Sequence, residues 1–251
     1  MSEIMLELRS ISKTFNPGTV NEKKAIDRVS LKVRRGDFIT IIGGNGAGKS
    51  TLINAITGVF PVDEGEIILD GIDITGLPEH KRARYFGRVF QDPMMGTAPN
   101  MGIEENLALA YRRGRRHGLS WGISARERVL YREQLGRLEL DLEGRMTQKV
   151  GLLSGGQRQA LTLLMATLIR PKVLLLDEHT AALDPKTAEK VLRITEEIVT
   201  GDNLTTLMVT HNMKNAIEHG NRLIMMNDGR IILDIAGAEK KKLTVEMLLE
   251  K

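Results

Sequence analysis

The 251 residues, of which 41% are hydrophobic and 27% charged, have the composition of an ordinary globular chain with a sizeable core. A balance of 36 Lys and Arg against 32 Asp and Glu leaves a net charge of +4, too small to predict a polyanion-binding protein, so we expect no nucleic-acid partner. The lack of cysteine excludes disulfides, a thiol nucleophile and a cysteine-based zinc site, and it suits a reducing cytosol.

The distribution of apolar residues argues against an exported or membrane-spanning chain. The first ten residues, MSEIMLELRS, lack the basic start and uninterrupted apolar stretch of a secretory signal. No apolar run approaches the roughly 20 residues that a membrane helix needs. We therefore expect a chain that neither crosses a membrane nor leaves the cell by that route.

The first part of the chain predicts strands and then a glycine-rich loop. Residues 4–33 contain short alternating segments separated by the turn-prone Asn16-Pro17-Gly18, which indicates a small antiparallel layer. A continuous apolar run at 38–42 ends in a glycine-rich stretch at 43–48, and a helical pattern follows at 49–57. The predicted order is buried strand, glycine loop, helix.

The rest of the chain predicts a parallel sheet covered by helices. Strand patterns at 65–71 and 87–90 are followed, from about residue 92 to 150, by a polar, Arg-rich, helix-like stretch that we interpret as an inserted helical subdomain. Helix and strand patterns then alternate, as parallel sheets require; they lie at 157–170, 173–177, 185–200 and 205–210. A hairpin signal at 227–229 and a helix capped by Thr244 end the chain.

The segment from Gly43 to Ser50 matches the phosphate-binding motif G-x-x-x-x-G-K-[ST], and it stands between a predicted strand and a predicted helix, as the motif requires. Its glycines let backbone N–H groups surround phosphate oxygens, and Lys49 brings a cation to the β- and γ-phosphates of ATP. The Ser50 hydroxyl is offered to Mg²⁺. The predicted nucleotide-binding residues here are Gly43, Asn45, Gly46, Ala47, Gly48, Lys49, Ser50 and Thr51.

Two adjacent carboxylates, Asp177 and Glu178, come at the carboxyl end of the buried strand pattern at 173–177. Ligands bind at this edge of open α/β sheets. We expect Asp177 to hold the Mg²⁺ shell, through water, and Glu178 to accept a proton from the attacking water. Helix capping is the alternative role for Asp177 taken alone.

Leu153-Ser154-Gly155-Gly156-Gln157 matches the signature sequence of ABC ATPases, and the chain resembles that family from Phe15 to the strand after His211. The resemblance implies an α/β fold, a P-loop NTPase with a RecA-like core, an N-terminal antiparallel β layer and an inserted ABC helical subdomain. It implies one ABC ATPase domain over residues 1–251. The core and β layer then take about 1–91 and 157–251, and the helical subdomain takes about 92–156.

The resemblance also implies that two copies act together. In the family, the signature meets the γ-phosphate of nucleotide held by the partner subunit, and a helix N-terminus is a suitable anion site. The implied unit is a head-to-tail pair that sandwiches two ATP molecules. The residues of the second half-site are Ser154, Gly155, Gly156, Gln157 and, in a dimer-facing loop, Asp184.

Three further positions match family residues, each with a structural alternative. Gln91 matches the glutamine that contacts Mg²⁺ and water and links the core to the helical subdomain, or it is an exposed turn residue. His211 matches the histidine that bonds the γ-phosphate, or it is structural. Phe15 matches the aromatic that stacks on adenine, or it belongs to the core. The implied catalytic set is Lys49, Gln91, Glu178 and His211, and the implied metal set is Ser50, Gln91 and Asp177.

Some positions depart from the family or stay outside its motifs. His179 stands where many relatives have Pro, which suggests a less rigid turn and a histidine at the dimer interface. The basic run at 112–117 is interpreted as a solvated face, with contact to a membrane subunit or anionic lipid, or to nucleic acid, as the alternatives. Met94 and Met95 line a partner groove or pack in the core, two readings that the sequence leaves open.

The resemblance implies the ATP-binding and hydrolysing subunit of a transporter, bound to integral membrane permease subunits at the cytoplasmic face of the membrane. The alternative is a soluble ABC ATPase acting on nucleic acid or ribosomes. A single set of motifs, without heptads or cysteines, favours transport. Residues 177–187 look like those of importers for amino acids or related solutes, which work with a branched-chain-permease-like protein and an extracytoplasmic solute-binding protein. The solute itself is not written in this subunit.

Overall fold

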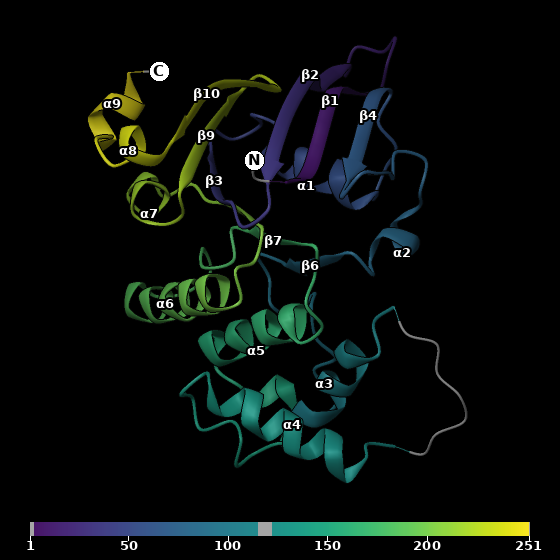
Figure 1. The fold of residues 1–251 in the computed structure, drawn as a ribbon, viewed down its shortest axis with the longest axis vertical. Helices are drawn as coiled ribbons and strands as arrows, with labels where there is room; N and C mark the ends of the chain where they lie inside the picture. The colour runs from purple at the N-terminus through teal and green to yellow at the C-terminus, as the bar shows by residue number, and fades with distance from the viewer. Residues whose placement is uncertain (1–2, 115–121, 251) are drawn as a thin grey trace.

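Two β-sheets and a set of helices make up the computed structural model, which describes residues 3–114 and 122–250 (Figure 1). The N-terminal sheet is antiparallel with the order β2-β1-β4-β5. Its strands are β1 (Ile4–Phe15), β2 (Lys23–Arg34), β4 (Glu64–Leu69) and β5 (Ile72–Asp73). The antiparallel layer expected from residues 4–33 is therefore present, and the strand pattern at 65–71 extends it.

The central sheet has the order β10-β9-β3-β8-β7-β6. Its first five strands in sequence are parallel to one another where they pair, and β10 returns antiparallel to β9 through the predicted hairpin. Parallel strands covered on both faces are apolar throughout, which explains the continuous apolar runs. The strands are β3 (Phe38–Ile42), β6 (Phe86–Val89), β7 (Val173–Asp177), β8 (Thr206–Val209), β9 (Arg222–Asn227) and β10 (Arg230–Ala236).

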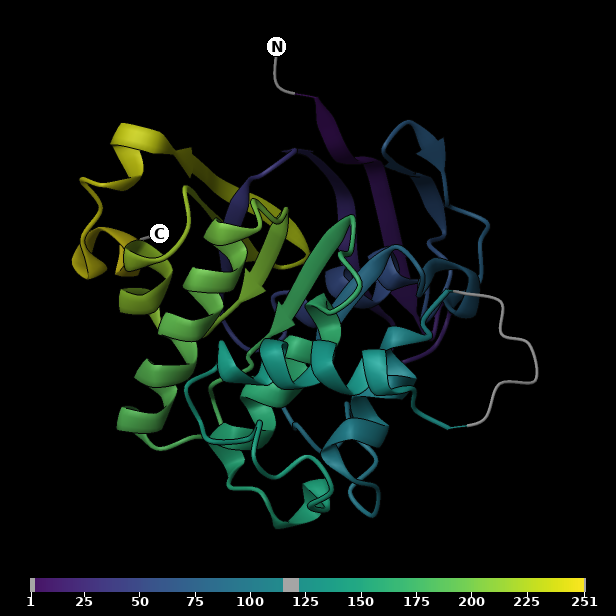
Figure 2. The same cartoon turned by 60° about the horizontal axis from the view of Figure 1, so that its bottom comes forward.

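Each face of the central sheet carries its own core, because successive side chains of a strand point to opposite faces. In β7, Val173 and Leu175 belong to a cluster with α1 (Lys49–Thr57) and the N-terminal sheet. Leu174 and Leu176 belong to a second cluster, formed with the helices on the other side. Those helices are α3 (Ile103–Tyr111), α4 (Ala125–Gly136), α5 (Gly155–Thr167) and α6 (Pro185–Gly201), which Figure 2 shows together on one side of the sheet.

The remaining elements are short. They are α2 (Glu79–Arg82), the 3₁₀ turn η1 (Val150–Leu152), α7 (Met213–Glu218), α8 (Gly237–Lys240) and α9 (Val245–Leu249). The helix capped by Thr244 is α9, as expected. Much of the stretch from 92 to 150 that looked helical is loop, and of its basic run only residues 112–114 fall within the described part. Each helix in the described ranges is too short or too polar to cross a lipid bilayer.

A buried arginine fixes the carboxyl end of α1. Arg82 is 1% exposed, and its guanidinium donates to four backbone oxygens, those of Ala55, Ile56, Thr75 and Leu77. A cation at this place neutralises the free carbonyls and the negative end of the helix dipole. Since the opposite end of α1 begins at Lys49, this contact sets the direction in which the glycine loop points.

Candidate nucleotide-binding and catalytic site

The glycine loop between β3 and α1 is held in shape by two close backbone contacts. A Cβ atom on Gly43 would lie 2.2 Å from the carbonyl oxygen of Met226, and one on Gly48 would lie 2.4 Å from that of Ala25. Both glycines also have positive φ values, 151° and 99°. No other residue type fits these two positions, so β2 and β9 together define the path of the loop.

Lys49 lies inside this loop. Its side chain is buried, and its ammonium donates to the carbonyl oxygens of Gly43 at 2.8 Å and Gly44 at 3.0 Å. An ammonium has three donors, and these two bonds leave the third for a ligand. The cation is thus already at the centre of the loop, as expected for a lysine that binds phosphate.

A cavity of about 340 Å³ opens beside the loop. Phe15, at the end of β1, forms one wall, and its ring meets that of Phe60 edge to face with 5.2 Å between centroids. Glu178 forms part of the opposite lining. The other lining residues are Lys23, Ala25, Asn45, Gly46, Ala47, Gly48, Lys49, Ser50 and Thr51. The predicted adenine-stacking residue therefore shares one pocket with the predicted phosphate-binding residues from Asn45 to Thr51, while Gly43 does not line it.

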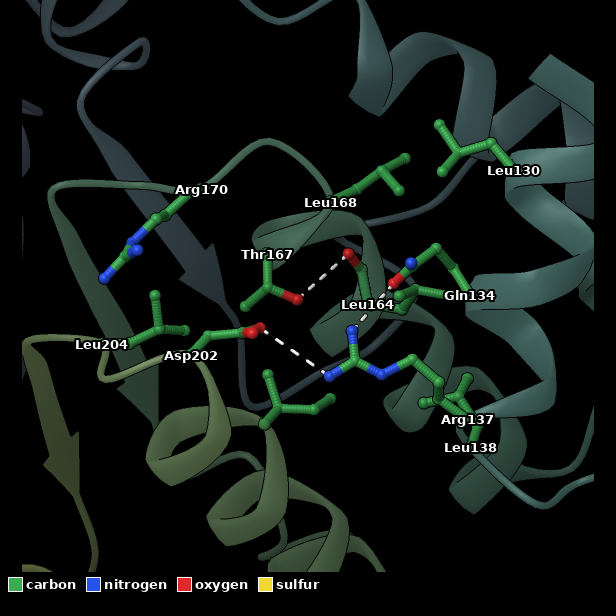
Figure 3. A pocket seen from close by; sticks show the side chains of 11 residues that line it. Leu130, Gln134, Arg137, Leu138, Leu164, Thr167, Leu168, Arg170, Asp202 and Leu204 are labelled. Carbon is green, nitrogen blue, oxygen red and sulfur yellow. Dashed lines mark hydrogen bonds and ion pairs between the residues drawn. The ribbon is translucent and has the colours of Figure 1, made fainter. Parts of the chain in front are cut away.

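A separate cavity of about 210 Å³ lies between α4, α5 and the end of α6, and none of the loop residues lines it (Figure 3). Arg137 spans it, with one nitrogen 3.1 Å from Gln134 Oε1 and another 3.9 Å from Asp202 Oδ2. These polar groups satisfy one another, and the remaining walls are mostly leucines. This cavity is part of the packing between helices, and its two arginines are engaged by neighbouring groups, Arg137 by Gln134 and Asp202 and Arg170 by the Asn203 carbonyl oxygen.

Asp177 lies at the end of β7, facing the first turn of α1. The Ser50 hydroxyl is 3.5 Å from its Oδ1, and the Arg88 guanidinium is 3.4 Å from its Oδ2. Burial raises the pKa of Asp177, the positive charge of Arg88 opposes this rise, and Glu178 adds to it. The oxygens of Ser50 and Asp177 can hold a divalent cation together. Within the described ranges no group of three His, Asp or Glu side chains forms a metal cluster, so such an ion needs phosphate and water oxygens as well.

Glu178 has a strained backbone that aims its side chain. Its φ is 47°, in the left-handed region, while its N–H donates to the Val209 oxygen at 3.0 Å. Strain of this kind persists only where the surroundings enforce it, and it gathers at functional sites. His211, after β8, brings its Nδ1 to 3.5 Å from Glu178 Oε2, and its side chain is 61% exposed. The two predicted catalytic groups therefore meet at the sheet edge beside the cavity.

The residues of the signature lie apart from this cavity. Ser154 caps α5, its hydroxyl accepting from the Gln157 N–H while its own N–H donates to Gln157 Oε1, each at 3.2 Å. Asp184 caps α6 in a similar way by accepting from the Thr187 N–H. The two caps pack together, because a Cβ on Gly156 would lie 2.2 Å from the Thr187 methyl. Gln91, which follows β6, is exposed and does not line the cavity beside the glycine loop.

The expectation that His179 would lie at a dimer interface is wrong. Its side chain is 2% exposed, and its Nε2 lies 3.1 Å from the Thr195 hydroxyl of α6. Burial lowers the pKa of His179 to about 4, and the neighbouring His219 adds to the effect. The buried imidazole packs against α6, so the turn after Glu178 is held in place by this contact although it lacks the proline found in many relatives.

Sequence reasoning missed the cations that surround the site. Arg88 contacts Asp177 from the neighbouring strand, and its nitrogen also donates to Asn54 Oδ1 at 2.7 Å. Lys23 pairs with Phe15 across the β1–β2 hairpin, which brings its ammonium to 3.1 Å from a Cβ placed on Gly46. Sequence could have indicated Lys23 only through its position opposite Phe15, and that position is known only once the register of β1 on β2 is known.

A glycine loop between a parallel strand and a helix, with acidic residues at the end of a neighbouring strand, defines a P-loop nucleotide-binding protein. Residues 26–181 match the family model described as ABC transporter. The chain belongs to the ABC transporter family, as an ATP-binding subunit with the ATPase activity of that family. The resemblance drawn from Ser154 to Gln157 is thereby confirmed.

Relatives match over nearly the whole chain. A tyrosine transport ATP-binding protein of Clostridioides difficile is 48% identical over 248 residues, which are 98% of each protein. The methionine import ATP-binding protein MetN of Bartonella henselae is 33% identical, over 97% of this chain and 70% of that one. The first of these similarities leaves no part of the chain longer than a few residues unmatched.

Solved structures show the same fold. A dimeric post-hydrolysis state of an ATP-binding cassette bound to ADP and Pi has a TM-score of 0.79 at 30% identity, covering 92% of this chain and 98% of that chain. An ADP conformation of an ATP-binding cassette of an ABC transporter has the same score and identity, with 99% of each chain covered. The predicted fold class, a P-loop NTPase with mixed sheets, is confirmed.

We expect replacement of Phe15 by leucine to weaken ATP binding by losing the stacking surface while keeping an apolar side chain. Aromatic stacking on a base contributes about 1–3 kcal/mol, so the Kd for ATP should rise roughly 5- to 150-fold. Inorganic tripolyphosphate, which has no base, should bind equally well to both proteins. Equal ATP affinity in a calorimetric titration would remove Phe15 from the base site.

The buried His179 predicts a specific loss of stability in acid. Its pKa of about 4 lies below the usual 6.5, so the folded state favours the neutral ring, and the stability it contributes is complete above pH 6.5 and lost as the pH falls toward 4. This loss amounts to about 3 kcal/mol. His179→Gln keeps a partner for Thr195 and should flatten the pH dependence of urea unfolding in this range. The same slope in both proteins would contradict the assignment.

Proposed function

We propose that this chain energises the import of tyrosine or a related amino acid, acting as a pair of copies at the cytoplasmic face of the membrane. The observation that carries this proposal is the 48% identity, over 98% of both chains, to a protein named for tyrosine transport. Other relatives are named for import of methionine, polyamines and phosphonates, which supports import more broadly. The alternative, an ATPase that acts on nucleic acid or ribosomes, is an outcome of the pull-down experiment below.

In the proposed pair, the cavity of one copy faces the signature of the other. Ser154 is exposed at the start of α5, and Gln157 and Gly156 line a different hollow from the one that contains Lys49. One copy thus carries two incomplete half-sites on its surface. The dimeric cassette bound to ADP and Pi, 30% identical to this chain, supports a pair of copies. A head-to-tail arrangement of that pair is the one that would complete both half-sites. Asp184 then lies in the loop between the copies.

We assign the phosphates of ATP to the glycine loop and to Lys49, and the base to Phe15. Ser50 and Asp177 are the proposed Mg²⁺ ligands, and the exposed Gln91 joins them by moving toward the site when nucleotide binds. Mg²⁺ bound to phosphate oxygens neutralises charge that develops on them during transfer. The assignment is supported by the facing oxygens of Ser50 and Asp177 and by the ammonium already held at the centre of the loop.

Glu178 is the proposed general base. The attacking water forms a bond to the γ-phosphorus and gives a proton to the Glu178 carboxylate, and the bond to the ADP oxygen breaks. The carboxylate lines the cavity and is partly exposed, so that water reaches it. The Nδ1 of His211 lies 3.5 Å from Glu178 Oε2, and this proximity supports its proposed role as a hydrogen-bond donor to the γ-phosphate.

Residues of about 92–156 form, in this proposal, a helical subdomain inserted between core parts at about 1–91 and 157–251, and this subdomain meets the permease. In Figure 1, α3 and α4 lie at the end of the molecule away from the N-terminal sheet. Apolar side chains are exposed here and just after Gln91: Met94 at 40%, Met95 at 70%, Leu109 at 54% and Leu152 at 72%. Exposed apolar groups of this kind mark partner surfaces. A solute-binding protein acts outside the membrane.

Exchange of Glu178 for glutamine should leave ATP binding intact and reduce turnover by a factor of 100 or more, since about 10²- to 10⁴-fold of the rate depends on such a base. Turnover of the unaltered protein should rise more than linearly with protein concentration, because the site needs two copies. Both are measured as Mg²⁺-dependent phosphate release. Unchanged activity in the variant would rule out Glu178 as the base, and strictly linear activity would rule out the pair.

The partner and the solute are tested together. A tagged copy of the chain, extracted gently from its own membranes, should bring down a membrane protein with many apolar segments. In vesicles containing the purified complex and its binding protein, ATP-driven uptake of labelled tyrosine should exceed that of labelled putrescine. Ribosomes or DNA in place of a permease would refute the transport assignment, and equal uptake of both solutes would refute the amino-acid assignment alone.

A further inference from the structure

An arginine, Arg88, lies beside the Asp177 carboxylate. The guanidinium of Arg88, on β6, lies between two other elements, since the same nitrogen is 2.7 Å from Asn54 Oδ1 on α1 and 3.4 Å from Asp177 Oδ2 on β7. Its other terminal nitrogen is 3.5 Å from the Thr57 hydroxyl, and its carbon is 4.6 Å from the centre of the Phe90 ring. Arg88 and Asp177 are 15% and 14% exposed.

A carboxylate with so little exposure needs a cation nearby. Taking a charged group out of water costs several kcal/mol unless it is paired. Lys49 donates to the carbonyl oxygens of Gly43 and Gly44, 2.8 Å and 3.0 Å away. Among the described residues, the cation that pairs with Asp177 is Arg88. Without a nucleotide, then, Arg88 supplies the positive charge that Asp177 requires.

The contacts of Arg88 differ in length, and this difference determines how readily Arg88 separates from Asp177. Charge-assisted hydrogen bonds to carboxylates are usually about 2.7–2.9 Å long, so the 3.4 Å contact with Asp177 is loose. The 2.7 Å bond to Asn54 and the stacking on Phe90 are tight. If the Asp177 contact opens, the side chain keeps its position through Asn54 and Phe90, so that separation of the pair requires no rearrangement of the strand.

We propose that Arg88 is a positioning residue. While the site is empty, its positive charge pairs with the Asp177 carboxylate in place of the metal ion, and the pair separates when Mg²⁺–nucleotide binds. The inference rests on the proposed role of Asp177 as a metal ligand. Arg88 competes with Mg²⁺ for the same carboxylate. It therefore stabilises the empty site and weakens the binding of magnesium–nucleotide.

The test compares the affinity for ADP with Mg²⁺ and with EDTA, by calorimetry, in the full-length chain. The ratio of the two affinities measures what the metal adds. Arg88→Met should raise this ratio about five- to tenfold, as expected for the loss of a partly buried competing charge. A merely structural arginine would not change it. Arg88→Gln, which keeps a hydrogen-bonding group for Asn54, should give the same rise and serves as the test if the methionine variant does not fold.

Two controls separate this inference from the proposed function. Arg113→Met removes another partly buried arginine, whose guanidinium donates to the carbonyl oxygens of Ala166 and Ile169, and it should leave the ratio unchanged. Asp177→Asn should lower the ratio, and adding Arg88→Met to it should have no further effect. An unaltered or lowered ratio in both Arg88 variants would overturn the inference alone. An unaltered ratio in Asp177→Asn would overturn the metal assignment, and the inference with it.

Discussion

Burial of α1 between two sheets is the constraint on which the site depends. One face of the helix packs on the N-terminal sheet and the other on the central sheet, so it can neither tilt nor slide without opening a core. Arg82 fixes its carboxyl end through four carbonyl oxygens, and the contacts of Gly43 and Gly48 with neighbouring backbone fix its amino end. The position of this helix therefore determines where several of the site residues lie. Lys49 and Ser50 belong to its first turn, and Asn54 holds Arg88 from its second.

The local parts of this arrangement could be predicted because each is written in a short stretch of sequence. A continuous apolar run predicted β3 and β7 as buried strands, and the glycine pattern between β3 and α1 predicted the loop together with its ligand. The order of Asp177 and Glu178 after β7 was enough to place two carboxylates at the edge of the sheet. The caps formed by Ser154, Asp184 and Thr244 are equally local, since a capping side chain needs only the helix that follows it.

What could not be predicted depends on contacts between distant segments. The pairing of Arg88 with Asp177 joins residues 89 positions apart, and it needs the parallel register of β6 on β7. The same is true of His179, whose burial follows from the position of Thr195 on α6 and not from any pattern around Glu178. The loops between residues 92 and 150 were read as helix from the polar, Arg-rich composition of the stretch, although Pro93, Gly96, Pro99 and Gly102 interrupt any helix pattern at its start. The paired half-sites were expected only through the resemblance, because a single chain contains no signal for a second copy.

The rigidity of the glycine loop limits what the loop itself can discriminate. Its shape is set by the carbonyl oxygens of Met226 and Ala25, and Lys49 is already bonded to Gly43 and Gly44, so the cradle is complete before any nucleotide arrives. A preformed cradle costs little ordering entropy on binding, for the product as for the substrate. In the proposed pair, the further contacts that distinguish ATP from ADP would then come from groups outside the loop, namely Glu178, His211 and the signature of the second copy. On this proposal the preformed loop would determine whether nucleotide is bound, and the surrounding groups would determine whether the bound nucleotide is hydrolysed.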